Sequence, residues 1–215
     1  MDKSKNVQLI QNIQKLYEPL NKELLFHGWH HIEFVARKAV EFASEIGNVN
    51  QELVEAAALT HDLNYIIDRK SEAEAGQEMR AQQLALVGFS TAEITEIDDI
   101  VVTSSITNRD SEISDAAKAL SDADCLYKIL PISLVTFSSK YIQETGVDLR
   151  QWADRIIKYQ RPLLDQGIYF YTESANRKYL DWAKKDIEFV ELISASLQDP
   201  DIQMLLKTSQ DLGIL

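Results

Sequence analysis

The chain has 215 residues, and 45% of them are hydrophobic, which is enough to bury one substantial core. Its 34 acidic and 22 basic residues give a formal net charge of -12, and a surface this acidic argues against duplex nucleic acid or an anionic membrane as a partner. A single cysteine excludes an internal disulfide, and no apolar run approaches the roughly 18 residues that a membrane span requires.

Apolar residues recur with the period of an amphipathic helix along nearly the whole chain, and Gly or Pro separates the periodic segments. The segment GIYFYTES at 167–174 is the one that looks extended, either as a short strand-like piece or as an aromatic-rich loop. We therefore predict an all-α, single-domain, multi-helix bundle over residues 1–215. With no apolar signal segment at the start, we expect a cytoplasmic protein. The predicted helices are 5–18, 30–46, 50–63, 71–87, 91–105, 112–129, 132–144, 149–165, 172–197 and 200–207.

The predicted helix at 30–46 begins with two histidines, in the sequence HHIEFVARKAVEFA. Helical steps from His31 reach Val35, Ala39 and Phe42, so His31 shares the apolar face, whereas His30 is rotated about 100° away from it. Taken alone, an inward histidine is either a satisfied core residue or a ligand.

The segment LVEAAALTHDLNY at 53–65 places three alanines just before His61 and Asp62. Small side chains of this kind permit the close approach of a neighbouring helix. A single His-Asp pair arises by chance in many chains of this size, so the pair gains meaning only from its context.

The segment AAKALSDADCLYKIL at 116–130 carries Asp122 and Asp124 in the middle of an otherwise apolar helix. A carboxylate in such a position needs a partner. The partner is either a metal ion or a lysine on the same helix, Lys118 or Lys128. Cys125 should face the core.

Together, the three segments resemble the H…HD…D pattern of the HD-domain superfamily of metal-dependent phosphohydrolases. In that family the first histidine opens a helix, the HD pair ends a helix rich in small residues, and the last aspartate lies in a DAD-L segment. The resemblance covers about residues 20–130, the expected HD core, and the helices at 132–215 should pack on it. It implies a metal site formed by His31, His61, Asp62 and Asp124.

Two imidazoles and two carboxylates would leave positions on one divalent ion for water and for a substrate oxygen. Mixed nitrogen and oxygen ligands favour Mn, Fe, Co, Ni or Zn over Mg. We therefore expect hydrolysis of a small phosphate ester, for which a nucleotide is one example. The alternatives are a catalytically inert regulatory protein that binds a metal or a nucleotide and, more distantly, an oxygenase. The chain has too few histidines for the second metal that the oxygenase branch requires.

The expected catalytic residues are Asp62, Asp68 and Lys128. Asp68 is either a general acid or base or a cap of the following segment. Lys128 lies one helical turn after Asp124 and either contacts the substrate phosphate or pairs with that carboxylate. Arg80 and Arg109 are further phosphate-binding candidates whose alternative is solvent exposure.

Three smaller expectations concern the surroundings of the site. Many family members have a basic residue where this chain has Phe34, which leaves the phosphate contact undefined. His27 and His30 either donate hydrogen bonds to the metal ligands or line the rim of the pocket, or they are simply exposed. The aromatic residues after position 150 either pack over the HD core or contribute to a substrate pocket or to the surface of a homodimer.

Overall fold

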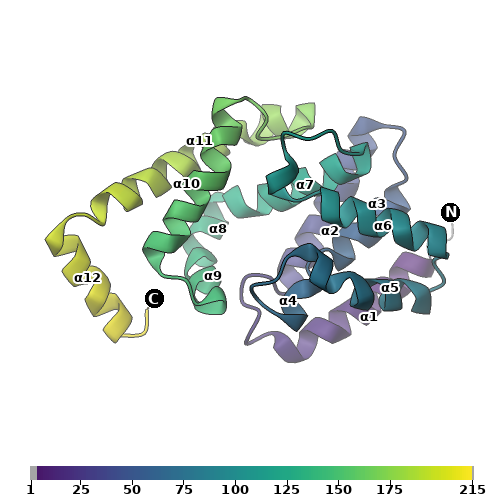
Figure 1. Ribbon diagram of the computed structural model, residues 1–215, viewed down its shortest axis with the longest axis horizontal. Coiled ribbons are helices and arrows are strands. Elements are labelled where there is room, and N and C mark those ends of the chain that lie inside the picture. Colours follow the sequence, from purple (N-terminus) through teal and green to yellow (C-terminus); the bar gives the residue numbers. More distant parts are fainter. Residues whose placement is uncertain (1–3, 215) are drawn as a thin grey trace.

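The computed structural model describes residues 4–214 and is helical throughout (Figure 1). No strand occurs in this range, so the all-α prediction is confirmed, and residues 167–172 form a loop that leads into a helix at Glu173. The helices are α1 (Ser4–Tyr17), α2 (Trp29–Ile46), α3 (Gln51–Thr60), α4 (Asn64–Ile67), α5 (Gln77–Leu86), α6 (Thr91–Thr103), α7 (Asp115–Ile129), α8 (Pro131–Thr136), α9 (Ser138–Thr145), α10 (Leu149–Asp165), α11 (Glu173–Ser196) and α12 (Pro200–Asp211).

Two predicted helices are interrupted in the structure. The segment predicted at 132–144 is split into α8 and α9 at Phe137. The segment predicted at 71–87 begins as a short 3-10 helix, Ala73–Gly76, and only then becomes α5. Gly76 packs against the chain just after the His-Asp pair, where a β-carbon would lie 2.8 Å from the backbone nitrogen of Asn64. This close approach requires glycine.

Helix α2 lies at the centre of the core and packs against α7 and α3. Its buried face holds His31, Val35, Ala39 and Phe42, as its periodicity predicts. The three alanines of α3, Ala56–Ala58, are fully buried, so α3 can approach its neighbours closely enough to place its C-terminal residues in the core.

Helix α1 belongs to this core, although the family resemblance was expected to begin near residue 20. Leu9, Ile13 and Tyr17 are buried in it, and the Tyr17 hydroxyl donates a hydrogen bond of 3.2 Å to the backbone carbonyl of Asp62. The N-terminal helix therefore helps to fix the position of the His-Asp pair.

The C-terminal helices form the other end of the molecule (Figure 1). Helices α10 and α11 pack against each other and share a smaller hydrophobic cluster with α9, which includes Ile142, Trp152, Ala153 and Val190. Helix α12 lies at the periphery and has no buried residue. Within residues 4–214, no helix has the length and apolar character needed to cross a membrane.

Candidate metal centre and adjoining pocket

Three of the residues predicted to bind metal converge at one point. His31 stands in the first turn of α2, and His61 and Asp62 directly follow α3, so the packing of α2 against α3 brings the three side chains together. Nε2 of His31 lies 3.2 Å from Nε2 of His61 and 3.0 Å from Oδ2 of Asp62, and the last two atoms are 3.3 Å apart.

This triangle has the size expected of metal ligands. Neighbouring ligands of an octahedral ion with bonds of about 2.1 Å lie about 3.0 Å apart. In the described part of the chain, His31, His61 and Asp62 form the group of potential metal-binding residues whose ligand atoms all lie within 4.8 Å of one another. The buried Oδ2 of Asp62 makes no well-aligned hydrogen bond despite its two close nitrogen neighbours. The donor set therefore fits a divalent transition metal ion.

The two imidazoles differ in charge state. Burial lowers the pKa of His61, but the charge of Asp62 and its hydrogen bond outweigh burial and raise the pKa from its ordinary value, so a metal ion would have to displace a proton from Nε2. Nδ1 of His61 lies 2.8 Å from the carbonyl oxygen of Ala58 and must carry a proton, because a carbonyl only accepts, so Nε2 is left to face Asp62. Burial lowers the pKa of His31 to about 4, even though Asp62 acts in the opposite direction. His31 is therefore neutral at neutral pH, as a metal ligand must be.

The carboxylate of Asp62 is held in its charged form. Burial alone would raise its pKa, but the neighbouring imidazoles of His61 and His31 keep the pKa well below its ordinary value. An ionised carboxylate beside two histidines is the charge state that a cation requires.

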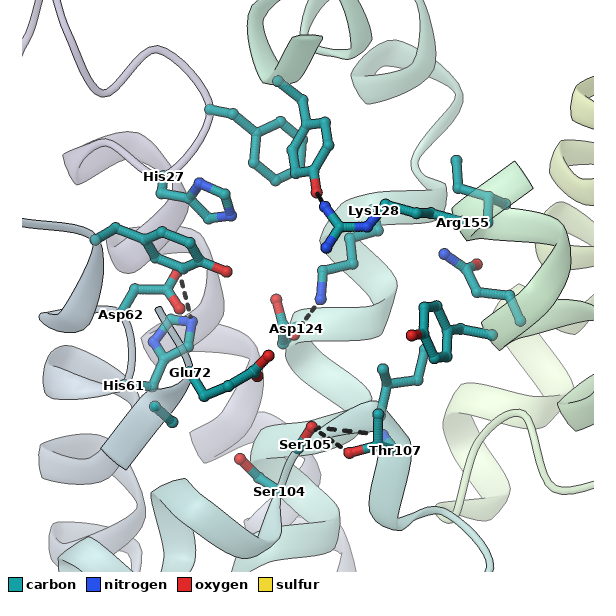
Figure 2. A pocket seen from close by; sticks show the side chains of 18 of the residues that line it. His27, His61, Asp62, Glu72, Ser104, Ser105, Thr107, Asp124, Lys128 and Arg155 are labelled. Atoms are coloured by element: carbon teal, nitrogen blue, oxygen red, sulfur yellow. Dashed lines mark hydrogen bonds and ion pairs between the residues drawn. The ribbon is translucent and has the colours of Figure 1, made fainter. Parts of the chain in front are cut away.

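Asp124 stands at the edge of this cluster. Its Oδ1 is 3.6 Å from Nε2 of His31, while its Oδ2 accepts a hydrogen bond of 2.5 Å from the ammonium of Lys128. The sequence presents two alternatives for Asp124, a salt bridge to Lys128 or a position beside the other predicted ligands. In the structure Asp124 has both. Figure 2 shows both side chains at the mouth of the site.

Asp122 has a different partner from the lysine predicted for it. It is fully buried and accepts hydrogen bonds from Arg109 at 2.7 Å and from the backbone nitrogens of Tyr171 and Thr172 at 2.9 Å and 2.7 Å. Lys118 pairs with Asp115 instead. Asp122 therefore ties the loop before α11 to α7.

A pocket of about 310 Å³ opens beside the ligand cluster (Figure 2). Its volume is in the range of small-molecule sites. His61, Asp62, Asp124 and Lys128 line one side of it, whereas His31 lies beneath them. The other walls come from α6 and the turn after it, from α8 and α9, and from α10 and α11. These walls include Ser104, Ser105, Thr107, Ser133, Ser138, Tyr141, Trp152, Arg155, Tyr159, Gln160 and Asp186, and Glu72 joins the lining from just before the 3-10 helix Ala73–Gly76.

Three ionisable residues of the pocket, Arg155, Glu72 and Asp186, were not identified from the sequence. Arg155 is exposed on α10 and donates a hydrogen bond of 3.1 Å to the Tyr141 hydroxyl, and its guanidinium lies near Lys128 in Figure 2. Glu72 follows the His-Asp pair by ten positions, and its carboxylate points toward Asp124 in Figure 2. The contributions of Arg155 and Glu72 depend on how remote helices pack, which helical periodicity does not report.

Three charged residues that the sequence suggests as catalytic or phosphate-binding candidates do not line the pocket. Asp68 is exposed and outside the pocket lining, and its carboxylate accepts a hydrogen bond of 3.0 Å from the backbone of Lys70, as the capping alternative predicts. Arg80 and Arg109 are neither solvated nor in the pocket. Arg80 is buried and paired with Asp98, and Arg109 is buried against Asp122.

His27 contributes a buried imidazole to the pocket. Its Nδ1 lies 2.5 Å from Oε1 of Glu144, and its ring stacks on Tyr65 with centroids 3.7 Å apart. Glu144 also accepts hydrogen bonds from the backbone nitrogens of Phe26 and His27, which fixes the segment before α2 on α9. His30, in contrast, is exposed and stacks on Phe137.

No protein-family model matches the chain, and no curated protein matches it at a significant level.

Solved structures, in contrast, share its fold. The chain superposes on YpgQ of Bacillus subtilis, solved in complex with ADP, with a TM-score of 0.60 and 21% identity, covering 93% of this chain and 99% of that one. A predicted HD-superfamily hydrolase from an uncultured Thermotogales bacterium gives 0.56 and 20%, with 88% and 91% covered. An HD-superfamily hydrolase from Bacillus thuringiensis gives 0.60 and 21%, with 90% and 98% covered. The resemblance predicted from the three sequence segments is thus confirmed at the level of the fold.

Proposed function

We propose that the protein is a metal-dependent phosphohydrolase acting on a small phosphate ester, with a nucleotide as the preferred class of substrate. The observation that carries this proposal is the convergence of Nε2 of His31, Nε2 of His61 and Oδ2 of Asp62 within 3.0–3.3 Å, beside a pocket that also contains two cationic side chains. The HD-superfamily hydrolases of the same fold support it.

His31, His61, Asp62 and Asp124 would hold the ion. When bound, a divalent ion of the series Mn, Fe, Co, Ni and Zn lowers the pKa of a coordinated water and offsets charge on the phosphoryl oxygens. Asp124 completes the set if Lys128 gives up its bond to Oδ2, or if Oδ1, which faces His31, serves as the ligand atom.

Lys128 and Arg155 are the proposed phosphate contacts. They face the pocket from α7 and α10, and each makes one hydrogen bond to a protein group in the described structure, to Asp124 and to Tyr141 respectively. An ammonium has three donors and a guanidinium has five, so both retain donors for phosphate oxygens. Their charge partly offsets the carboxylates of the pocket, which would otherwise repel a phosphorylated substrate.

Glu72 is the proposed proton acceptor. It is exposed to the pocket, and in Figure 2 its carboxylate points toward Asp124. A carboxylate in this place can accept a proton from the attacking water. Asp68, which the sequence singles out, lies outside the pocket lining.

The ligand state of the solved relative supports a nucleotide. YpgQ of Bacillus subtilis was solved with ADP, and the pocket described here, at about 310 Å³ with polar and aromatic walls, has the character of a nucleotide site. The aromatic side chains of the pocket are Phe26, Tyr65, Tyr141, Trp152 and Tyr159, and the last two belong to the aromatic residues after position 150.

A regulatory protein without turnover is the second candidate function. The bond of 2.5 Å between Lys128 and Asp124 favours it, because a carboxylate engaged by an ammonium is a weaker metal ligand. A homodimer and a cytoplasmic location stay predictions from the sequence.

A phosphatase screen of the purified protein across the five metals separates the two functions. The panel contains nucleoside mono-, di- and triphosphates and simple phosphate monoesters. Turnover that needs metal and disappears in the Asp62→Ala variant supports the hydrolase. Stabilisation of the protein by a nucleotide and metal, without release of phosphate or pyrophosphate from any substrate, supports the regulatory protein.

A further inference from the structure

One wall of the pocket is built by α10 and α11. Helix α10 lines the pocket with residues 152, 155, 156, 159 and 160, a spacing that places all of them on one helical face. From the first to the last of these residues the helix rises about 12 Å, so the face is long enough to contact different parts of one ligand. Asp186 of α11 joins this wall.

Asp186 is a buried carboxyl group without a protein partner. Its side chain lines the pocket although the residue is only 6% exposed. Within residues 4–214, its Oδ1 makes no hydrogen bond, and no Lys, Arg or His lies within ion-pair distance of it. Burial raises the pKa of this carboxyl to about 7. A buried carboxyl group is costly unless something binds it, so its persistence at a pocket wall points to a ligand.

Gln160 lines the same pocket from α10. Its Oε1 accepts a hydrogen bond of 2.7 Å from the hydroxyl of the buried Tyr169. In this orientation the Nε2 hydrogens have no protein acceptor in the described structure. Because Gln160 lines the pocket and is itself buried, its NH₂ group is available to a bound molecule.

We propose that Asp186 and Gln160 bind the part of the substrate that lies beyond its phosphate, and that they recognise an N–H donor next to a hydrogen-bond acceptor. In a nucleotide this pattern is the polar edge of the base. The proposal rests on the proposed function, since the same pocket would hold the phosphate near the metal ligands.

The charges that line the pocket indicate where the phosphate and the base of a nucleotide would bind. A phosphate near Asp186 would meet a carboxyl group with no cation beside it, whereas Lys128 and Arg155 lie on the side of Asp124 and Tyr141. The phosphate therefore belongs with the cations, and an uncharged polar group belongs with Asp186. Gln160 lies about 7.5 Å further along α10 than Arg155, and this distance allows a sugar to separate a phosphate from a base.

The partly exposed ring of Tyr159 lies in the same wall. One face of this ring is near the ammonium of Lys158, whose nitrogen lies 4.9 Å from the ring centroid. An aromatic ring beside a donor and an acceptor is the combination by which proteins hold a flat heterocycle.

The experiment compares the parent protein with Asp186→Asn and Gln160→Glu. The first variant removes the charge and keeps the shape, and the second keeps the acceptor for Tyr169 and removes the donor. Asp181→Asn is the matched control, because Asp181 lies on α11 and its side chain is largely exposed. The probes are ATP, GTP, CTP and UTP, the base-free compounds tripolyphosphate and ribose 5-phosphate, and the four free nucleosides. Circular dichroism confirms that each variant is folded.

Both site variants should raise KM for the preferred nucleotide roughly tenfold or more, because each loses a buried hydrogen bond to the base. The values for the base-free compounds and for the control variant should stay within about twofold of the parent, as no contact to the base is involved. The inference is overturned if KM rises equally for nucleotides and for base-free compounds, or if it rises for neither.

Two further outcomes separate this inference from the proposed function. If the parent hydrolyses no phosphate ester but is stabilised by a free nucleoside, and both variants lose that stabilisation, the base contact stands and the hydrolase does not. If the parent hydrolyses nucleotides and base-free phosphates with equal kcat/KM and binds no nucleoside, the hydrolase stands and the base contact is overturned. Absence of both turnover and nucleoside binding overturns both.

Discussion

Asp122 and Asp124 lie two residues apart on α7 and face different partners. Residues two apart on an α-helix are rotated by about 200°, so the two carboxylates cannot serve the same neighbour. Asp122 points to Arg109 and the loop before α11, in the fully buried interior. Asp124 points to Lys128 and His31, at the pocket. A sequence of three residues therefore combines a buried ion pair with a carboxylate that faces the pocket.

The first prediction contrasts these two residues. Asp122→Ala should lower the free energy of unfolding by about 3–5 kcal/mol, because the buried Arg109 charge and two backbone N–H groups lose their acceptor. Asp124→Ala should cost much less stability, because its side chain is partly exposed. Urea denaturation in the presence of EDTA measures both without the contribution of bound metal. Equal losses in the two variants would contradict the division of roles.

The second prediction concerns the metal centre. The His61→Ala and Asp62→Ala variants should purify without stoichiometric Mn, Fe, Co, Ni or Zn and should lose the rise in Tm that these metals give the parent. Their helical content should stay near that of the parent. Elemental analysis and thermal denaturation measure the two properties.

His30→Ala is the control for these variants, since His30 is the exposed neighbour of His31 and stacks on Phe137 instead of facing the cluster. It should bind metal as the parent does. A metal content in His61→Ala equal to that of the control would show that the convergence of the two imidazoles serves packing only.

The third prediction tests Lys128 as a phosphate contact. Lys128→Met keeps most of the apolar stem and deletes the charge. If the ammonium binds the substrate phosphate, KM should rise, and kcat should fall as well if the contact strengthens in the transition state. Unchanged kcat and KM, with metal bound as before, would mean that Lys128 is only the intrahelical partner of Asp124.

The fourth prediction tests Arg155, the pocket cation contributed by α10. Arg155→Gln should raise KM for a phosphorylated substrate roughly tenfold, the effect of one lost charge-assisted hydrogen bond. Lys207→Gln makes the same change of charge at an exposed residue of α12, outside the pocket lining, so it reports the effect of net charge alone. Steady-state kinetics at two salt concentrations compares them. Parallel changes in both variants would remove Arg155 from the site.

The sequence could predict that His31, His61 and Asp62 meet because the family resemblance rests on short local segments, each of which lies in or directly after one helix. The periodicity of α2 places His31 on the same helical face as Val35 and Phe42. The alanines of α3 predict that another helix packs closely against it just before His61. These signals are local. The pairing of the helices then follows from burying their apolar faces.

The far wall of the pocket could not be predicted in this way. Arg155 and Gln160 reach the pocket only because α10 packs beside α11 and across from α7, and helical periodicity does not say which helices become neighbours. A local signal did exist at Asp186, which shares one helical face with the apolar residues Ala183, Ile187 and Val190, all buried. Asp122 and Asp124 were identified from the sequence by the same feature, a carboxylate among the apolar residues of a helix.

The buried arginines have a similar explanation. Arg80 lies one helical turn before the buried Leu84 on α5, and Arg109 lies in the turn after α6. Their acidic partners, Asp98 and Asp122, come from other helices. Without the tertiary arrangement these arginines resemble ordinary surface residues.

The last prediction uses the buried carboxyl of Asp186. Burial raises the pKa of this group in the folded protein to about 7, whereas an unfolded aspartate titrates near 3.9. The folded state therefore binds the proton more tightly. The stability that goes with the protonated group is fully present below about pH 4 and is lost as pH rises through about pH 7.

Asp186→Asn keeps the side chain neutral at every pH and so avoids this loss. Its free energy of unfolding should be close to that of the parent at pH 4 and should exceed it by roughly 2–4 kcal/mol at pH 8. Urea denaturation of both proteins at several pH values, with EDTA present, gives the difference directly, and Asp181→Asn should show no such trend because its carboxylate is solvated. A difference between Asp186→Asn and the parent that is the same at pH 4 and pH 8 would contradict this prediction, because it would mean that folding does not raise the pKa of Asp186.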